Sequence, residues 1–291
     1  MSVMTQHTPR EARDTRDFTG GIAELADGKL YALQHQFALD GRVSAYPASA
    51  RFEFYRAADG STFVNVGAVI QAADLYPRGT TAGSTLRLYA SLTPAPAAGP
   101  ARYASNDAHP QVVEPAKGPP PGNVYDVWTG LALKPGTYRA TLAIEDSLTG
   151  RIGRTAADIE VPDFGKPGLR LSTLVLASDI SDSGGRLGVT ARTSGIFRKS
   201  ETLGIYYEVY GLAGGEAARF QSSYRFYREM PDGAPASPIG KPIVFEDRSG
   251  AVQGWSFPLA KWPPGHYRMD VTVTGADSVS ATSQVAFEVV E

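Results

Sequence analysis

The sequence predicts an all-β protein made of two related domains, on three observations. The segment Pro-Gly-Thr-Tyr-Arg at residues 135–139 recurs as Pro-Gly-His-Tyr-Arg at residues 264–268, and each copy precedes an alternating run that ends in Glu-Val. The copies are a whole domain apart, much farther than the units of a solenoid or propeller. Apolar and polar residues alternate in many short runs, which is typical of strands, and no segment has a sustained helical period.

Composition bounds the class of protein. The 291 residues suit two domains, since single cores stop growing at roughly 250–300 residues. The net charge of −2 is scattered, which argues against nucleic acid or an anionic membrane as partner. No apolar run approaches the roughly 20 residues that span a bilayer. Cysteine is absent, so disulfides, thiolate nucleophiles and sulfur-ligated metals are excluded.

The first 20 residues are expected to be a disordered lead, because Thr, Arg, Asp and Glu dominate them. They contain no apolar signal core. Two interpretations of the localisation stay open. Either the chain starts at Met1 and has no export signal, or it is the C-terminal part of a longer secreted protein. In the second case it is periplasmic or extracellular.

The first domain is assigned to residues 21–162. Its strand signals include Phe52 and Phe54 around Glu53, and alternating runs within 62–70 and 86–92. A proline-rich loop at 94–122 interrupts this pattern, and its prolines exclude a central strand. Two roles remain open for this loop: disorder or polyproline packing, or a binding loop.

A short stiff linker is expected at residues 163–168, because a proline lies near each of its ends. The second domain then covers residues 169–291. Its strand signals fall at 169–177, 185–193, 203–211, 220–228 and 252–257, followed by the second Pro-Gly-x-Tyr-Arg segment.

The repeated tyrosines Tyr138 and Tyr267 specify the kind of β fold. In immunoglobulin-like sandwiches, a tyrosine near the start of a late strand turns its hydroxyl back to the upstream backbone. We therefore predict two tandem immunoglobulin-like, or fibronectin III-like, β-sandwiches. Trp128 and Trp255 precede the two tyrosines and are expected to be core anchors, with ligand platforms as the alternative.

The segment 161–164, Val-Pro-Asp-Phe, followed by the strand at 169–177, resembles the inter-domain signature of certain bacterial tandem β-sandwich regions. These regions lie C-terminal to GWxTD or von Willebrand factor A-like domains. Residues 52–56 and 62–64 are similar to the opening of such a region, whereas Gly254-Trp255-Ser256 is not the GWxTD motif. The resemblance implies an envelope-associated interaction region and carries over no catalytic residue.

The four histidines are the candidate catalytic bases, because a nucleophile needs a base beside it. His109 follows Ser105 and Asp107 within the proline-rich loop. These three would form the catalytic site of a hydrolase that acts on a small ester, lactone or glycan. The site would lie near the domain junction, and calcium could take part in the reaction. Loop polarity explains the same three residues without catalysis.

Asp179 and Asp182 are the candidate metal ligands. They flank serines and precede a glycine pair, a composition that suits calcium, which takes six to eight oxygen ligands. An ordinary hairpin turn has the same composition. Calcium is therefore a possible cofactor, and no other cofactor is expected.

The second domain is rich in tyrosine. Tyr206 and Tyr210 share one face of a strand, and Tyr224 and Tyr227 lie on another strand, on opposite faces. An exposed set of tyrosines could stack on sugars or anchor a protein. Cross-strand aromatic pairs can equally stabilise a sheet without any ligand.

Together these observations predict a non-catalytic interaction module of a bacterial envelope or secreted protein. Its expected partner is a protein, bound through a sheet edge or the tyrosine face. The alternatives are the hydrolase described above and a pair of carbohydrate-binding accessory domains.

Overall fold

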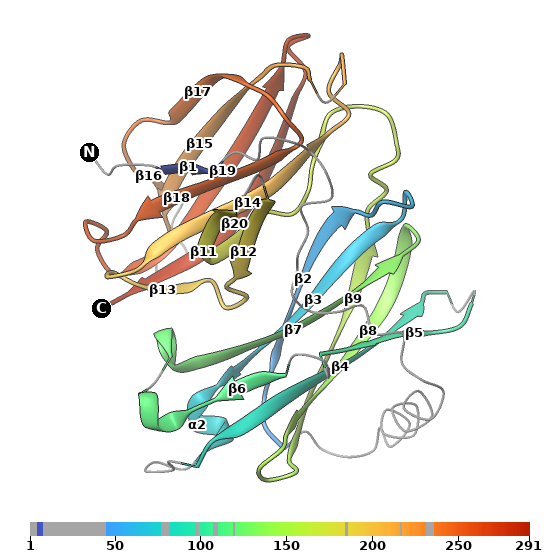
Figure 1. Cartoon of the computed structure of the whole chain (residues 1–291), viewed down its shortest axis with the longest axis vertical. Coiled ribbons are helices and arrows are strands. Elements are labelled where there is room, and N and C mark those ends of the chain that lie inside the picture. The colour runs from blue at the N-terminus through green and yellow to red at the C-terminus, as the bar shows by residue number, and fades with distance from the viewer. Residues whose placement is uncertain are drawn as a thin grey trace. The chain divides into compact units, whose positions relative to one another are not determined.

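The computed structural model of the 291-residue chain confirms the all-β prediction (Figure 1). The structure describes residues 5–7, 45–76, 82–96, 99–106, 110–118, 120–183, 186–215, 217–230 and 236–291. Contacts within the chain define two compact units, which meet in the sequence between Asp163 and Phe164. We call residues 19–163 the first sandwich and residues 164–291, together with 1–18, the second sandwich.

The first sandwich contains two antiparallel sheets (Figure 1). One sheet has the order β2 (Ser49–Arg56), β3 (Thr62–Gln71), β7 (Val124–Leu133). The other has the order β5 (Arg102–Ser105), β4 (Ser84–Pro94), β8 (Gly136–Asp146), β9 (Ile152–Val161), and β6 (Gln111–Val113) also pairs with β4. Alternate side chains of β3, β4 and β8 are buried in one apolar core between the sheets.

The second sandwich repeats this plan with more strands. One sheet has the order β1 (Thr5–His7), β18 (Val252–Pro258), β14 (Thr202–Tyr210), β11 (Val175–Ser183), β12 (Arg186–Ala191), and β10 (Arg170–Leu171) pairs with β14. The other has the order β13 (Ile196–Arg198), β20 (Ser280–Val290), β19 (Gly265–Gly275), β15 (Phe220–Arg228), β16 (Ser237–Pro238), and β17 (Ile243–Arg248) pairs with β15. In this sheet the edge strand β13 pairs in parallel with β20.

The duplicated tyrosines occupy the same setting in both sandwiches. The hydroxyl of Tyr138 donates to the carbonyl of Lys134 over 3.0 Å, and that of Tyr267 donates to the carbonyl of Pro263 over 2.5 Å. The glycines two residues earlier, Gly136 and Gly265, have φ angles of 147° and 153°, which favour glycine. The predicted tyrosine corners are therefore confirmed, each at the start of a strand between two others.

The two tryptophans differ in position. Trp255 is 2% exposed and stacks on Phe245 in the core of the second sandwich, as predicted. Trp128 is only half-buried and does not belong to the core. Its neighbour Val127 faces the core, and successive residues of a strand point to opposite faces, so Trp128 lies on the outer face of β7.

The proline-rich stretch has more structure than expected. The short strands β5 and β6 form within it, and short 3-10 turns lie at Pro115–Lys117 and Pro121–Asn123. Both strands pair with the edge of β4, at positions between the prolines. Proline is compatible with such short edge strands, although it excludes a central one.

Two further segments differ from expectation. Residues 5–7 were expected to be disordered, yet they form β1, which pairs with the edge of β18 and satisfies backbone groups there. In the expected linker, the ring of Phe164 packs against Tyr210 with ring centroids 4.9 Å apart.

The described residues contain one α-helix, α2 (Ala72–Leu75). It is too short to cross a membrane.

Candidate functional site

One face of the second sandwich is a broad polar surface, which we call the open face. It is the outer side of the sheet formed by β17, β15, β19 and β20, whose inner side faces the core. Along each strand, buried and more exposed residues alternate. The outward residues of these strands include Val244, Glu246, Gln221, Ser223, Arg225, Tyr227, His266, Arg268, Asp270, Thr272, Thr274, Ser280, Thr282, Gln284, Ala286 and Glu288.

Tyr227 and two arginines form the centre of one half of the open face. Register places Tyr227 opposite Arg268 and places Arg225 opposite Asp270. The guanidinium carbon of Arg268 lies 4.4 Å from the centroid of the Tyr227 ring, and that of Arg225 lies 5.9 Å away. Asp270 holds Arg268 through contacts of 2.9 and 3.4 Å. The cation–π contact and the ion pair thus fix one arginine, whereas Arg225 is exposed and makes no ion pair with any described residue.

The other half of the open face carries hydroxyl groups. Thr272 and Thr282 are opposite each other on β19 and β20, with their hydroxyl oxygens 2.9 Å apart. Thr274 and Ser280 repeat this arrangement at 2.8 Å. Such cross-strand pairs stabilise the sheet, and they leave a flat surface of small polar groups.

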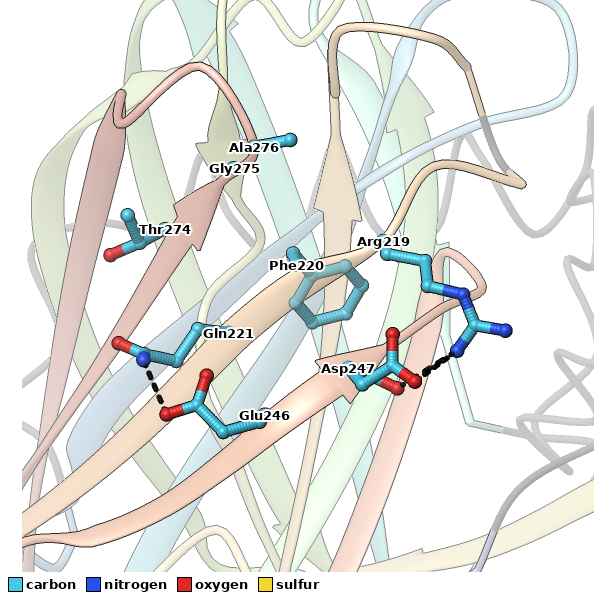
Figure 2. A pocket seen from close by; sticks show the side chains of 8 residues that line it. All are labelled: Arg219, Phe220, Gln221, Glu246, Asp247, Thr274, Gly275 and Ala276. Carbon is cyan, nitrogen blue, oxygen red and sulfur yellow. Dashed lines mark hydrogen bonds and ion pairs between the residues drawn. The ribbon is translucent and has the colours of Figure 1, made fainter.

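The open face ends in a pocket of about 280 Å³ where β15, β17 and β19 meet (Figure 2). Phe220, which is 3% exposed, and Ala276 contribute the apolar part of its lining. Gln221 donates from its amide nitrogen to one carboxylate oxygen of Glu246 over 2.8 Å. Thr274 lies opposite Gln221 across the two strands.

A β-bulge in β17 positions the acidic side of this pocket. Phe220 pairs with Arg248 while Ser222 pairs with Phe245, so Glu246 and Asp247 together oppose a single residue of β15. Asp247 has a φ of 63°, the left-handed conformation of an extra residue in such a bulge. Its carboxylate contacts Arg219 at 2.6 Å at the rim of the pocket.

Three of the four tyrosines predicted to bind a ligand are buried. Tyr206 is 2% exposed and Tyr210 4%, and both donate to the carboxylate of Glu208, over 2.6 and 2.5 Å. Tyr224 is fully buried, and its hydroxyl lies 2.7 Å from that of Tyr207. Their rings are therefore not exposed for stacking on a ligand, and of the four only Tyr227 lies on the open face.

Burial also affects acidity in this core. Desolvation raises the pKa of Tyr207 to about 12, and it raises the pKa of Tyr224 well above the ordinary value. Both hydroxyls therefore stay protonated at physiological pH. They stabilise the core as neutral hydrogen-bonding groups.

The candidate hydrolytic residues are only partly described. Asp107 and His109 lie outside the described residues. Ser105 is at the end of β5, is 3% exposed, and its hydroxyl has no hydrogen-bond partner in the part of the chain that the structure describes. A nucleophile must reach its substrate, and a hydroxyl buried in this way does not.

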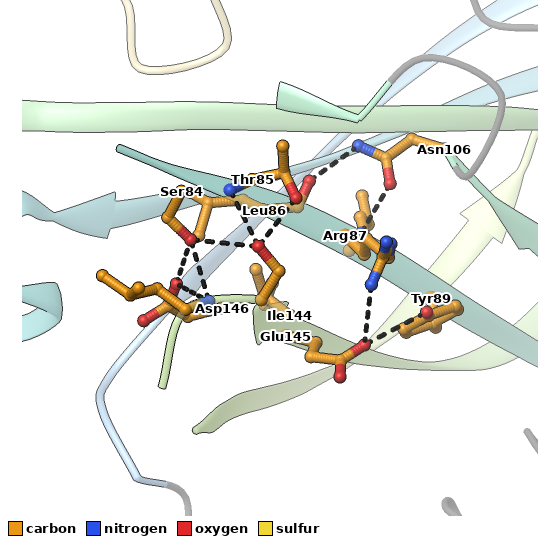
Figure 3. Close-up of polar contacts among 12 residues, drawn as sticks. Ser84, Thr85, Leu86, Arg87, Tyr89, Asn106, Ile144, Glu145 and Asp146 are labelled. Carbon is orange, nitrogen blue, oxygen red and sulfur yellow. Dashed lines mark hydrogen bonds and ion pairs between the residues drawn. The ribbon is translucent and has the colours of Figure 1, made fainter. Parts of the chain in front are cut away.

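Asn106, which follows Ser105, has a structural role that the sequence analysis missed (Figure 3). Its side-chain oxygen accepts from the backbone N–H of Leu88 over 2.7 Å, and its side-chain nitrogen donates to the carbonyl of Leu86 over 3.3 Å. These bonds continue the pairing along β4 between the end of β5 and the start of β6. Asn106 is 5% exposed, so the bonds satisfy groups that water does not reach.

Asp146 is the centre of a second buried network in the first sandwich (Figure 3). Its carboxylate accepts from the hydroxyls of Tyr76, Ser84 and Thr149 and from the backbone N–H of Leu148. The network ties the turn after β8 to β4 and to the end of α2. Its members are bonded to one another, which gives them a structural role.

The predicted metal ligands Asp179 and Asp182 both lie on β11 and are exposed. Asp179 pairs with Thr190, and Asp182 pairs with Leu187 on β12. Residues three apart in a strand point to opposite faces, so the two carboxylates do not converge. The strands β11 and β12 form a hairpin around the glycine pair, which itself lies outside the described residues.

No protein-family model matches the chain, and no curated protein matches it. Many solved structures give weak likenesses, and three of them serve as examples. A red sea bream transglutaminase shares 10% identity over 92% of this chain, with a TM-score of 0.24, and the chain spans 34% of that enzyme's length. The C-terminal domain of the Streptococcus agalactiae antigen I/II polypeptide BspA shares 10% identity over 83% of this chain and all of that domain, with a TM-score of 0.20. The C-terminal domain of the Streptococcus pyogenes antigen I/II-family protein AspA shares 8% over 84% of this chain and all of that domain, with a TM-score of 0.24. Likenesses with TM-scores this low define neither the fold nor the function of the chain.

Proposed function

We propose that this chain is a non-catalytic interaction module that binds a protein partner through the open face of the second sandwich. The observation that carries the proposal is the grouping of Tyr227 with Arg225 and Arg268 on an exposed sheet surface. Tyrosine and arginine are the side chains most enriched, with tryptophan, at the energetic centres of protein interfaces.

The side chains around Tyr227 are already held in place by the fold, which favours binding. Arg268 is held both by its ion pair with Asp270 and by its cation–π contact with the Tyr227 ring. Immobilising a long side chain costs about 0.5–1.5 kcal/mol when a complex forms. Because the fold already orders Arg268, a partner that contacts it loses less of this entropy. Arg225 adds a positive charge that can attract and orient a partner.

A protein suits this surface better than a glycan. Sugars stack on an open aromatic ring, whereas one side of the Tyr227 ring is covered by Arg268 at 4.4 Å. The neighbouring aromatic residues of β15, Tyr224 and Phe226, face the core. The flat, mixed polar surface around Tyr227 resembles the rim and centre of a protein interface.

The absence of cysteine makes a direct test possible. A single cysteine introduced by Thr282→Cys carries a photo-crosslinker on the open face, and Asp158→Cys carries it on the first sandwich as the control. The captured protein is then purified, and its affinity for the uncrosslinked chain is measured. Tyr227→Ala and Arg225→Ala should each weaken binding about tenfold, which corresponds to about 1.4 kcal/mol.

Two outcomes would overturn the proposal. In one, the purified protein binds the Tyr227→Ala and Arg225→Ala variants as tightly as the parent chain. In the other, crosslinking occurs equally from the control position on the first sandwich. Binding to a glycan array that is lost on Tyr227→Ala would replace the protein partner by a carbohydrate.

A further inference from the structure

The pocket at the end of the open face gathers oxygen atoms from three different side chains. Figure 2 shows Thr274, Gln221 and Glu246 with their oxygens along the same side of the pocket. A carboxylate only accepts hydrogen bonds, so the Gln221 amide nitrogen must be the atom that donates to Glu246 at 2.8 Å. The amide oxygen of Gln221 is thereby turned away from Glu246 and is available as an acceptor.

We infer that this pocket binds the ammonium group of a lysine side chain presented by the partner protein. The inference rests on the proposed function for the identity of the partner as a protein. An ammonium group has three donors and no acceptor. The hydroxyl of Thr274, the amide oxygen of Gln221 and the carboxylate of Glu246 are three acceptors, one of them charged.

The charge of the pocket agrees with this ligand. Its charged lining residues are Arg219, Glu246 and Asp247, and the contact of 2.6 Å between Arg219 and Asp247 neutralises that pair. Glu246 makes no ion pair with any described residue, and its side of the pocket is therefore negative. The bulge at Asp247 directs the Asp247 carboxylate to the rim and away from the core, where regular alternation would have placed it.

The lining also distinguishes lysine from arginine. A guanidinium binds a carboxylate best through two parallel hydrogen bonds, one to each oxygen. One oxygen of Glu246 already accepts from Gln221, which leaves a single oxygen fully available. A compact ammonium needs only one oxygen from each neighbour. Ala276, with the small part of Phe220 that reaches the pocket, provides apolar surface for the four-carbon stem.

The test is an NMR titration of the full chain with Nα-acetyl-lysine methylamide. We expect saturable shifts of the Gly275 and Ala276 amides at millimolar probe concentrations, which is typical of a single side chain. The arginine analogue should bind about tenfold more weakly. The norleucine analogue, which has the stem without the ammonium, should give no saturable shift.

Two variants make the test specific. Glu246→Gln should abolish the lysine-dependent shifts, because it removes the charge and keeps the shape. Glu288→Gln makes the same change on β20 of the same face, outside the pocket, and should leave the shifts intact. Both positions are at the surface, and the amide spectrum of each variant reports directly whether it has folded.

The inference is overturned if norleucine matches lysine, if Glu246→Gln binds lysine as the parent does, or if no saturable shift occurs up to about 50 mM. The experiments distinguish a failure of this inference from a failure of the proposed function. If lysine does not bind while Tyr227→Ala still weakens the partner, only the pocket assignment falls. If lysine binds but Tyr227→Ala leaves the partner's affinity unchanged, the proposed binding centre falls.

Discussion

At the residue scale, two buried carboxylates show how surroundings decide acidity. Burial raises the pKa of Glu53 above its ordinary value, and the nearby Arg51 and the amide of Asn65 compensate only in part. Burial also acts to raise the pKa of Asp146, but the hydrogen bonds from Ser84, Thr149 and the neighbouring backbone outweigh it, so that pKa is lowered. The two residues therefore affect stability with opposite dependence on pH.

The change Glu53→Gln should stabilise the protein at neutral pH. The folded-state pKa of Glu53 lies above the unfolded value of about 4.3, so the folded state binds more protons and loses stability as the pH rises from that value through the folded pKa. Glutamine does not titrate and still accepts from Asn65. The gain in the free energy of unfolding should be absent at pH 4 and reach at least about 1 kcal/mol at pH 8, as measured by urea unfolding. A gain that is the same at both pH values would contradict this account.

The change Asp146→Asn should have the opposite dependence. The folded-state pKa of Asp146 is lowered, so its contribution is present above the unfolded value of about 3.9 and is lost as the pH falls through the folded pKa. We expect a loss of about 1–3 kcal/mol at pH 7 from the broken bonds to this buried group. The loss should shrink as the pH is lowered below about 4. A loss that grows with acidity would show that Asp146 is not ionised in the folded protein.

At the element scale, the edge of β4 is completed by a side chain. Asn106 bonds to the backbone at Leu86 and Leu88, at the junction between the part of β4 that pairs with β5 and the part that pairs with β6. Asn106→Ala should therefore cost about 1–3 kcal/mol, because it leaves buried backbone groups without partners. Hydrogen exchange should show faster exchange in β5, β6 and the facing part of β4. Gln111→Ala, at an exposed position of β6, is the control. Equal exchange in both variants would refute the role of Asn106.

The elements also show what sequence could and could not reveal. Period-two alternation is visible in the sequences of β15, β19 and β20, so the outward position of Arg268 and Asp270 could have been predicted from the pattern that predicted the strands. The burial of Tyr206 and Tyr210 could not, since β14 is buried on both faces and alternation then carries no signal.

The pocket and the completion of the β4 edge by Asn106 could not be predicted from the sequence either, but for a different reason. The pocket depends on a bulge that shifts the register of β17 by one residue, and the register of a strand pair is set by tertiary contacts. The pairing of β5 and β6 depends on a side chain that substitutes for backbone. Neither effect leaves a periodic trace in the sequence.

At the scale of the whole molecule, the duplicated corner predicts two cores with separate stability. Tyr138→Phe and Tyr267→Phe each remove one hydrogen bond, for about 1 kcal/mol. We expect Tyr138→Phe to lower hydrogen-exchange protection in β4 and β8, and Tyr267→Phe to lower it in β15 and β19. If either variant lowers protection equally in both sandwiches, the chain unfolds as one cooperative unit.

The function proposed for the molecule requires that the open face be accessible in the intact chain. Adjacent serines of β15 test this most directly, because Ser222 is fully buried and Ser223 lies on the open face. In the cysteine-free chain, single Ser222→Cys and Ser223→Cys variants are isosteric and can be labelled with a maleimide. We expect rapid labelling at position 223 and strong protection at position 222. Equal protection at both positions would show that the proposed binding surface is covered, and would contradict the account.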